Sequence, residues 1–347
     1  MTTQIVNASN MLGHGVLHAF YRGNRYHCLF LKATFDWVAD GLMLPAAEPM
    51  PLQLNDSFVD EPETADPDFI REIAPLRYPA DLTPFRPKTD VVLVGDAVAP
   101  DGRPQRDWLA RLKVGKLEQG LHVCGPRYWE YSRLSGWTLS EAEPVSSVAL
   151  DYRLAFGGSR ENEAGELEYF EANPVGLGWL DPQKLDRNQR YRAPQLLRPG
   201  ERLSDEPGKT VSVAGFAPVS PFWAPRSLLA GNYQGEEGYP DDFELGFWNA
   251  APESLQAEPM LKGGEWIELE GLSAQGIERS RLPTYMVWAS VDTGTERPRL
   301  ASMGLDLVYL DWTRRQVVMR WGAVVDEAEG ARRISLHATA LDRSHRE

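Results

Sequence analysis

A strand-like segment that ends on two adjacent glycines lies near the middle of the chain and constrains its fold most. From Val148 to Phe156, large apolar residues alternate with small or polar ones, which puts the large ones on one face of an extended strand. Gly157 and Gly158 follow, and Asn173-Pro-Val-Gly-Leu-Gly178 comes soon after. Glycine adopts backbone angles that other residues avoid, so this pattern predicts a sharply bent junction. We expect a β-rich module on each side of it.

Short alternating segments separated by turn residues recur along the rest of the chain, whereas no segment has a sustained helical period with a cap at each end. The expected strands are 26–37, 90–94, 108–114, 121–124, 266–270 and 284–291, and 305–311 with 317–321 forms the clearest hairpin. We therefore predict a mainly β protein with two antiparallel β-sandwich-like modules, long loops and few short helices. The modules are 1–150 and 151–330, the second containing the glycine-rich junction, and a basic tail occupies 331–347. A single continuous curved sheet is the alternative.

Composition and charge restrict the partners and the compartment. The formal net charge of −14 argues against nucleic acid or an anionic membrane as the main partner. The first residues lack the basic region and apolar block of a secretory signal, and no run approaches the ~18 apolar residues of a membrane helix. Cys28 and Cys124 lie in strand-like segments, which indicates two buried thiols in a reducing compartment. We expect a cytoplasmic protein.

Motifs of nucleotide binding and hydrolysis are missing, and the histidines offer little chemistry. His14 and His18 would share a metal ion only on a helix, but the flanking Gly-His-Gly indicates loop and strand, and no third ligand stands nearby. His122 and Cys124 are expected to be packed core residues, because a reactive cysteine needs an exposed, electropositive setting. We predict no catalytic residues, no metal and no cofactor.

An acidic cluster among aromatic residues is the one pattern that favours an enzyme. Asp241, Asp242 and Glu244 lie in an aromatic-rich loop, and 11 tryptophans are present. Paired carboxylates with tryptophan platforms are typical of a carbohydrate-active enzyme or lectin on a β-sandwich. The simpler interpretation is a Pro-Asp turn that caps its own backbone, with tryptophans filling a β core.

Motifs in one order along most of the chain resemble a bacterial family catalogued as domain of unknown function 2169. Lys32-Ala-Thr-Phe35, Gly115, Gly263-Gly-Glu265 and the hairpin from Leu305 to Trp321 are among the matching segments. The remaining matching residues are Lys88, Asp90, Arg127, Trp129, Phe156, Gly157, Gly158, Asn173, Pro174, Gly176, Gly178, Asp242, Phe243, Asn249 and Pro252. The chain departs from the family pattern at Pro126, Leu177 and Leu307, where Asp, Arg and Thr are expected.

The resemblance implies a non-enzymatic adaptor or co-chaperone of the type VI secretion system. Such proteins help to load an effector onto the spike in the cytosol. The implied partners are the effector or its PAAR domain, the VgrG spike and, in addition, a second adaptor chaperone. No enzymatic activity and no cofactor come with the resemblance.

An adaptor of this kind could hold its client in two ways. An exposed edge strand could donate backbone hydrogen bonds to the client. An aromatic patch with a polar rim could anchor it, because turn-dense loops place aromatic residues near the surface. The candidate contacts are Trp223, Tyr233, Tyr239, Phe247 and Trp248. The alternative is that these five side chains fill the core.

Overall fold

The computed structural model describes residues 3–11, 13–59, 73–233, 235 and 238–342 of the chain. These residues form a mainly β structure, which confirms the predicted fold class. The helical elements among them are short 3-10 turns: η1 (Pro100–Gly102), η2 (Tyr152–Leu154), η3 (Ser227–Ala230), η4 (Leu245–Trp248), η5 (Glu253–Leu255) and η6 (Glu327–Glu329). None of the helices in this part of the chain has the length and apolar character that a membrane span requires.

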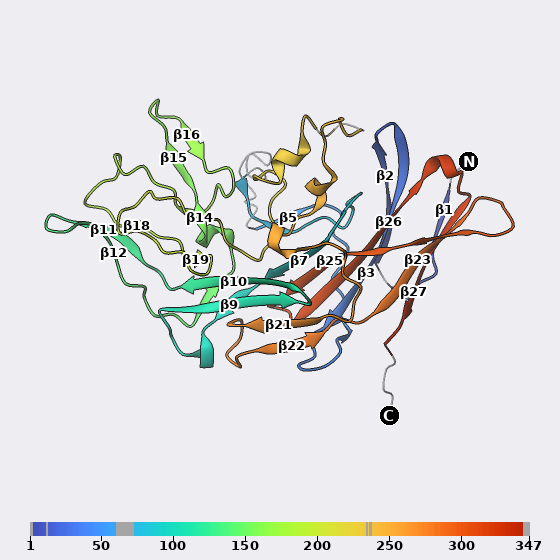
Figure 1. The fold of residues 1–347 in the computed structure, drawn as a ribbon, viewed down its shortest axis with the longest axis horizontal. Helices are drawn as coiled ribbons and strands as arrows, with labels where there is room; N and C mark the ends of the chain where they lie inside the picture. Colours follow the sequence, from blue (N-terminus) through green and yellow to red (C-terminus); the bar gives the residue numbers. More distant parts are fainter. Residues whose placement is uncertain (1–2, 12, 60–72, 234, 236–237, 343–347) are drawn as a thin grey trace.

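The largest sheet brings the two ends of the chain together (Figure 1). Its strands lie in the order β2 (Gly13–Tyr21), β3 (Asn24–Asp36), β26 (Gln316–Asp326), β25 (Gly304–Asp311), β7 (Thr89–Val94) and β20 (Gln256–Ala257), and β4 (Leu44–Pro45) pairs with the end of β3. β7 and β25 run parallel, and the other neighbours run antiparallel. The hairpin predicted from 305–311 and 317–321 is confirmed, because β25 and β26 pair directly. β3 and β4 form a second hairpin, whose connection contains the turn residues Asp40 and Gly41.

A second sheet combines a hairpin from the first half of the chain with strands from the second half. Its order is β19 (Leu196–Leu197), β10 (Leu117–Cys124), β9 (Asp107–Val114), β21 (Trp266–Glu270) and β22 (Glu278–Arg281). Both large sheets thus contain strands from either side of residue 150, the boundary predicted between the modules. The strands form several sheets rather than one continuous curved sheet.

A third sheet corrects the expectation of a peripheral tail. Its order is β1 (Gln4–Asn7), β27 (Arg333–Ala340), β23 (Tyr285–Asp292) and β24 (Arg299–Ser302). β27 lies inside this sheet, and Ile334 and Leu336 are buried in the core. The prediction weighed the charge of the tail and missed the two-residue alternation of Ile334, Leu336 and Ala338 with polar residues, which indicates a strand. Residues 343–347 of the predicted tail lie outside the described part.

Smaller sheets from the middle of the chain lie to one side of the large ones (green, left in Figure 1). One contains β12 (Gly136–Leu139), β11 (Tyr128–Ser132) and β18 (Tyr191–Arg192). Two pairs of strands also belong to this part of the chain, β14 (Phe156–Gly157) with β17 (Leu177–Gly178) and β15 (Ser159–Glu161) with β16 (Leu167–Tyr169). Two further pairs include earlier strands of the chain, β13 (Ser147–Ala149) with β8 (Asp96–Val98) and β5 (Ser57–Phe58) with β6 (Leu76–Tyr78).

The segment predicted as one strand from Val148 to Phe156 is interrupted by a turn. Between β13 and β14 the chain forms η2, and the Asp151 carboxylate accepts a hydrogen bond from the Arg153 backbone N–H at 2.8 Å. The predicted burial is nevertheless correct for Val148, Tyr152 and Phe156. A 3-10 turn inside an apolar alternation can still direct these side chains into the core, so the pattern predicted the burial and missed the turn.

One hydrophobic core connects the three large sheets. It includes Leu31 of β3, Leu112 of β9 and Leu336 of β27. Cys28 and Cys124 are buried free thiols, as predicted. Burial raises the pKa of the Cys28 thiol to about 12, which keeps it protonated and unreactive.

Candidate functional site

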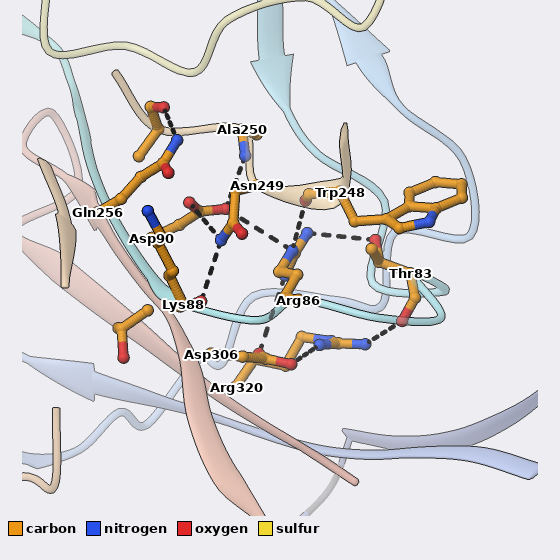
Figure 2. Close-up of polar contacts among 12 residues, drawn as sticks. Thr83, Arg86, Lys88, Asp90, Trp248, Asn249, Ala250, Gln256, Asp306 and Arg320 are labelled. Carbon is orange, nitrogen blue, oxygen red and sulfur yellow. Dashed lines mark hydrogen bonds and ion pairs between the residues drawn. The ribbon is translucent and has the colours of Figure 1, made fainter. Parts of the chain in front are cut away.

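A buried network of charged side chains occupies the region where β7, β25 and β26 meet (Figure 2). Arg86 precedes β7, Asp90 lies in β7, Asp306 in β25 and Arg320 in β26. All four residues are at most 6% exposed. Ionised groups are rarely buried to this extent without charged partners and hydrogen bonds. The interactions of each group therefore decide what the network can do.

Arg86 lies between the two aspartates of the network. Its guanidinium nitrogens lie 3.7 Å from Asp90 Oδ2 and 3.9 Å from Asp306 Oδ1. Its Nε also donates to the Trp248 carbonyl at 3.2 Å, and its Nη2 donates to Thr83 Oγ1 at 3.2 Å. Five donors in a rigid plane suit arginine for this bridging position.

Asp90 connects β7 to the loop that follows η4. Its carboxylate accepts hydrogen bonds from Asn249 Nδ2 at 3.0 Å and from the Ala250 backbone N–H at 2.7 Å. The Asn249 amide also donates to the Lys88 carbonyl at 3.0 Å. Burial raises the pKa of Asp90, while Arg86 and these donors act in the opposite direction. The loop is thereby fixed against the edge of the large sheet.

Arg320 extends the network to the segment around Asp81. It forms an ion pair with Asp306, its Nε donates to the Asp81 carbonyl at 3.0 Å, and its Nη2 donates to the Thr83 carbonyl at 2.8 Å. The Asp81 carboxylate pairs with Lys32 Nζ at 2.7 Å. Burial lowers the pKa of Lys32, and Asp81 opposes this shift.

These contacts fix segments to one another, and the charged groups that make them are buried. Removing one partner of a buried ion pair is strongly destabilising, although such pairs contribute little to stability compared with a well-packed apolar core. We interpret the network as a device that fixes the positions of 80–90 and 248–250 on the large sheet. The alternation along 26–37 predicts a polar face for Lys32, opposite Leu31 and Ala33, but the structure buries Lys32 as well. The sequence contained one signal that could have predicted the network: Asp306 and Arg320 each lie between apolar residues of an expected strand.

The glycine-rich junction forms a second buried polar centre. Asn173 is fully buried, and its Nδ2 donates to the Tyr152 carbonyl at 2.7 Å and to the Phe156 carbonyl at 3.0 Å. Gly157 has a φ of 147°, and a Cβ there would lie 2.1 Å from the Asn173 carbonyl oxygen. A Cβ on Gly176 would lie 2.5 Å from Asn173 Nδ2. The predicted bent junction is thus a close approach of backbones around one asparagine side chain.

The other residues that carry the resemblance have mainly structural surroundings. Trp129 is buried and donates its Nε1–H to the Ser204 carbonyl at 2.9 Å, and Phe243 is buried too. Lys88 is half-buried and forms a surface pair with Glu258 at 3.4 Å. Half-buried positions are also found for Arg127, Gly176, Pro252 and Glu265, while Gly158, Pro174 and Gly178 are buried. At the departures from the pattern, Leu307 is buried, and Pro126 and Leu177 are half-buried.

The five candidate contact aromatics do not form a common surface. Trp223 is 1% exposed and packs against Tyr152 with ring centroids 5.6 Å apart, and Phe247 is buried as well. For these two residues the expectation of a surface position is wrong, because the turn-dense segment folds inward over the core. Tyr233, Tyr239 and Trp248 are half-buried. The Tyr239 ring contacts both Tyr233 and Trp248, with centroids 5.1 Å and 5.9 Å apart.

This aromatic cluster touches the free side of β2. The Tyr239 backbone N–H donates to the Phe20 carbonyl at 3.2 Å, and Phe20 forms an isolated bridge with Gly238. Backbone groups of an edge strand point alternately toward its neighbour and away from it. Since the Phe20 carbonyl points away from β3, those of His14, Val16 and His18 do so too.

The acidic cluster of the predicted aromatic loop is a turn. Asp241, Asp242 and Glu244 are exposed. Both oxygens of Asp242 accept from the Asn232 backbone N–H, at 3.2 Å and 3.1 Å, and Asn232 Nδ2 donates to Asp242 Oδ2 at 2.8 Å. The carboxylate of Asp242 is thus engaged by Asn232, a backbone contact as in the simpler interpretation, although the partner lies ten residues earlier instead of in the same turn.

His122 and Cys124 lack the geometry of a catalytic pair. The same ring nitrogen, His122 Nε2, lies 3.9 Å from Cys124 Sγ and 3.2 Å from Asp107 Oδ1. In a catalytic triad the nucleophile and the carboxylate engage different ring nitrogens. The contact with Cys124, together with Asp107, raises the pKa of His122 to about 9 despite its partial burial. Cys124 is itself buried.

The fold and the two buried centres define a mainly β scaffold whose motif residues act largely in the interior. The model of a family described as an uncharacterized protein conserved in bacteria, DUF2169, matches residues 22–322. The chain belongs to this bacterial family. Neither a curated protein nor a solved structure matches the chain.

Proposed function

We propose that the chain is a non-enzymatic adaptor that acts in the cytosol and holds a type VI secretion effector, or its PAAR domain, for loading onto the VgrG spike. The resemblance of the motifs suggested this role, and the interior position of most motif residues is consistent with it. A pattern that specifies buried contacts maintains a scaffold, so the binding function falls to the surface that the scaffold presents.

The observation that carries the proposal is the exposed edge of β2. This strand has nine residues, and in the described chain its outer side pairs only through the Phe20–Gly238 bridge. A long edge strand with free N–H and C=O groups is a template for an added strand. We propose that a client segment pairs with β2 between His14 and His18, next to the half-buried rings of Tyr233 and Tyr239.

Val16→Pro tests this proposal without removing a hydrogen bond from the β2–β3 ladder, because the Val16 N–H points away from β3. Proline is tolerated at such an edge position and cannot donate to an added strand. Val16→Thr is the matched control, because it keeps the N–H and the β-branched shape. The gene is deleted in the native host, and secretion of the PAAR-associated effector is measured after complementation with each variant.

Deletion is expected to abolish effector secretion, the wild type and Val16→Thr to restore it, and Val16→Pro to restore little of it although the protein stays folded. Unchanged secretion after deletion contradicts the adaptor role. Full restoration by Val16→Pro contradicts pairing at β2. Glycan turnover that disappears in Asp242→Asn would instead identify a carbohydrate-active enzyme.

A further inference from the structure

Two histidines and a glutamate from three segments converge at the end of the β2–β3 hairpin. His18 and His27 are direct cross-strand partners, and their ring centroids lie 4.9 Å apart. Glu327 begins η6 directly after β26, the neighbour of β3 on its other side. Glu327 Oε1 lies 2.8 Å from His18 Nδ1 and 3.8 Å from His27 Nδ1. The ligand atoms of all three side chains lie within 4.8 Å of one another.

The surroundings of His27 determine which of its nitrogens is free. Thr3 donates its hydroxyl hydrogen to the Ala331 carbonyl at 2.8 Å. Because this hydrogen is used, the Thr3 oxygen can only accept a hydrogen bond from His27 Nε2, which lies 3.4 Å away. His27 Nε2 therefore carries the proton, and the lone pair of Nδ1 faces the Glu327 carboxylate. His27 is 5% exposed, and Nδ1 has no hydrogen-bond partner among the described residues.

Two lone-pair acceptors that face each other across 3.8 Å need a cation between them. A divalent metal ion placed there binds the neutral imidazole and the carboxylate at the same time. A hydrogen bond from the second ring nitrogen to a fixed group, here Thr3, is the usual support of a metal-bound histidine.

We propose that His18, His27 and Glu327 bind a divalent transition-metal ion, with Zn²⁺ as the best fit. Two imidazole nitrogens and one carboxylate oxygen match the ligand preference of Zn²⁺. Bond lengths of about 2.1 Å put tetrahedral ligand atoms about 3.4 Å apart, so only small movements are required. The His18 side chain, which is 64% exposed, is free to make them.

The site opens on a cavity of about 640 Å³, which leaves room for water to complete the coordination. Arg332 is the positively charged group that lines this cavity. Its guanidinium packs over the backbone of Gly294, where a Cβ would lie 2.5 Å from Arg332 Cζ. The bound ion would connect β2, β3 and the end of β26 at the edge of the large sheet, which is a structural role independent of the proposed function.

Zinc titration of the untagged, chelator-stripped full chain by calorimetry tests the site. We expect one Zn²⁺ per chain with a dissociation constant on the order of micromolar or tighter, and a thermal unfolding midpoint that rises with zinc. His18→Ala and His27→Gln should each weaken binding at least about tenfold. His14→Ala is the matched control, because His14 is an exposed histidine on the same strand that contacts Asn7 instead.

The His18→Ala variant keeps the test decisive if His27→Gln does not fold, because His18 is exposed. Co²⁺ in place of Zn²⁺ should give the absorption of a tetrahedral centre in the wild type and in His14→Ala, and lose it in His18→Ala. Absence of stoichiometric zinc binding, or equal binding by His18→Ala and His14→Ala, overturns the proposal and leaves the three side chains as a hydrogen-bonded clamp.

Discussion

Asn249 donates its side-chain amide to the carboxylate of Asp90 at 3.0 Å, across 159 residues of sequence. The contact joins two segments that are far apart in the sequence, β7 and the loop after η4. Asp90 supplies a buried negative charge next to Arg86, and Asn249 brings the loop after η4 onto that charge. Asp90 and Asn249 therefore have a structural role, which stability measurements on variants can test.

Asp90→Ala should destabilise the fold strongly. The substitution removes one of the two carboxylates next to Arg86, and it removes the acceptor for the Asn249 side-chain amide and the Ala250 backbone N–H. Breaking a buried ion pair from one side costs about 3–5 kcal/mol. Urea unfolding followed by tryptophan fluorescence measures the loss. Lys88→Ala is the control, with an expected loss below about 0.5 kcal/mol, because its pair with Glu258 is a surface one. Similar losses for the two variants would contradict a structural role for the network.

Asn173→Ala should lower the free energy of unfolding by about 2–4 kcal/mol. The Phe156 carbonyl loses its side-chain donor, and the Tyr152 carbonyl keeps only the Ala155 backbone N–H at 3.1 Å. A buried group left unsatisfied costs about 1–3 kcal/mol, and the lost contacts of the fully buried side chain add to this cost. Asn188→Ala serves for comparison, because Asn188 is exposed in the same part of the chain and its loss should be within about 0.5 kcal/mol. Equal urea midpoints for these two variants would show that the junction does not depend on the Asn173 amide.

Gly157→Ala should be far more damaging than Gly136→Ala. Both glycines have a positive φ, so each substitution adds backbone strain of about 1–2 kcal/mol. At Gly136 no atom lies within 4 Å of the new Cβ, whereas at Gly157 the Asn173 carbonyl oxygen lies 2.1 Å from it. We expect Gly157→Ala to lose more than about 3 kcal/mol. Thermal unfolding of both variants provides the comparison, and a Gly136→Ala protein as unstable as Gly157→Ala would refute the steric argument.

Glu278 should contribute to the acid sensitivity of the fold. Burial alone would raise the pKa of its carboxyl, but the hydrogen bonds and charge of Arg315, with donors from Ser273 and Trp37, lower it overall. A carboxyl with a lowered pKa stabilises the folded state above its unfolded pKa, and this stabilisation is lost as the pH falls through the folded pKa. The window therefore lies below about pH 4.5.

The variant Glu278→Gln should lose about 1–2 kcal/mol at pH 7 and show a smaller difference from the wild type at pH 3. Urea unfolding at several pH values gives the two curves. Glu329→Gln is the control, because its pair with Arg299 is largely exposed and its effect should stay below about 0.5 kcal/mol. A difference for Glu278→Gln that does not shrink at low pH would contradict the assigned ionisation.

The turn at residues 21–24 shows how the contact between His18 and His27 was missed, although the sequence contains the two strands that bring them together. β2 ends at Tyr21 and β3 begins at Asn24, so the register pairs His18 with His27. The sequence suggested only His14 as a partner of His18, at the four-residue spacing of a helix, and that site was rejected because the flanking residues indicate loop and strand. In a strand four residues span about 13 Å, which is too far for a shared ion. Glu327 could not be found in this way, because it reaches the site through the pairing of β26 with β3.

The sequence by itself determined the mainly β class, the strands at 90–94 and 266–270, the hairpin that ends at Trp321, and the burial of both cysteines. These features follow from the two-residue period of side chains along a strand, which is a local property of the chain. The tertiary structure alone decided the parallel pairing of β7 with β25, the interior position of β27 and the burial of Lys32, Asp306 and Arg320. Each of these features depends on which distant segment of the chain packs against the residues concerned. The free energy of burying a charged side chain or a strand is set by the segment that covers it and not by the local sequence pattern.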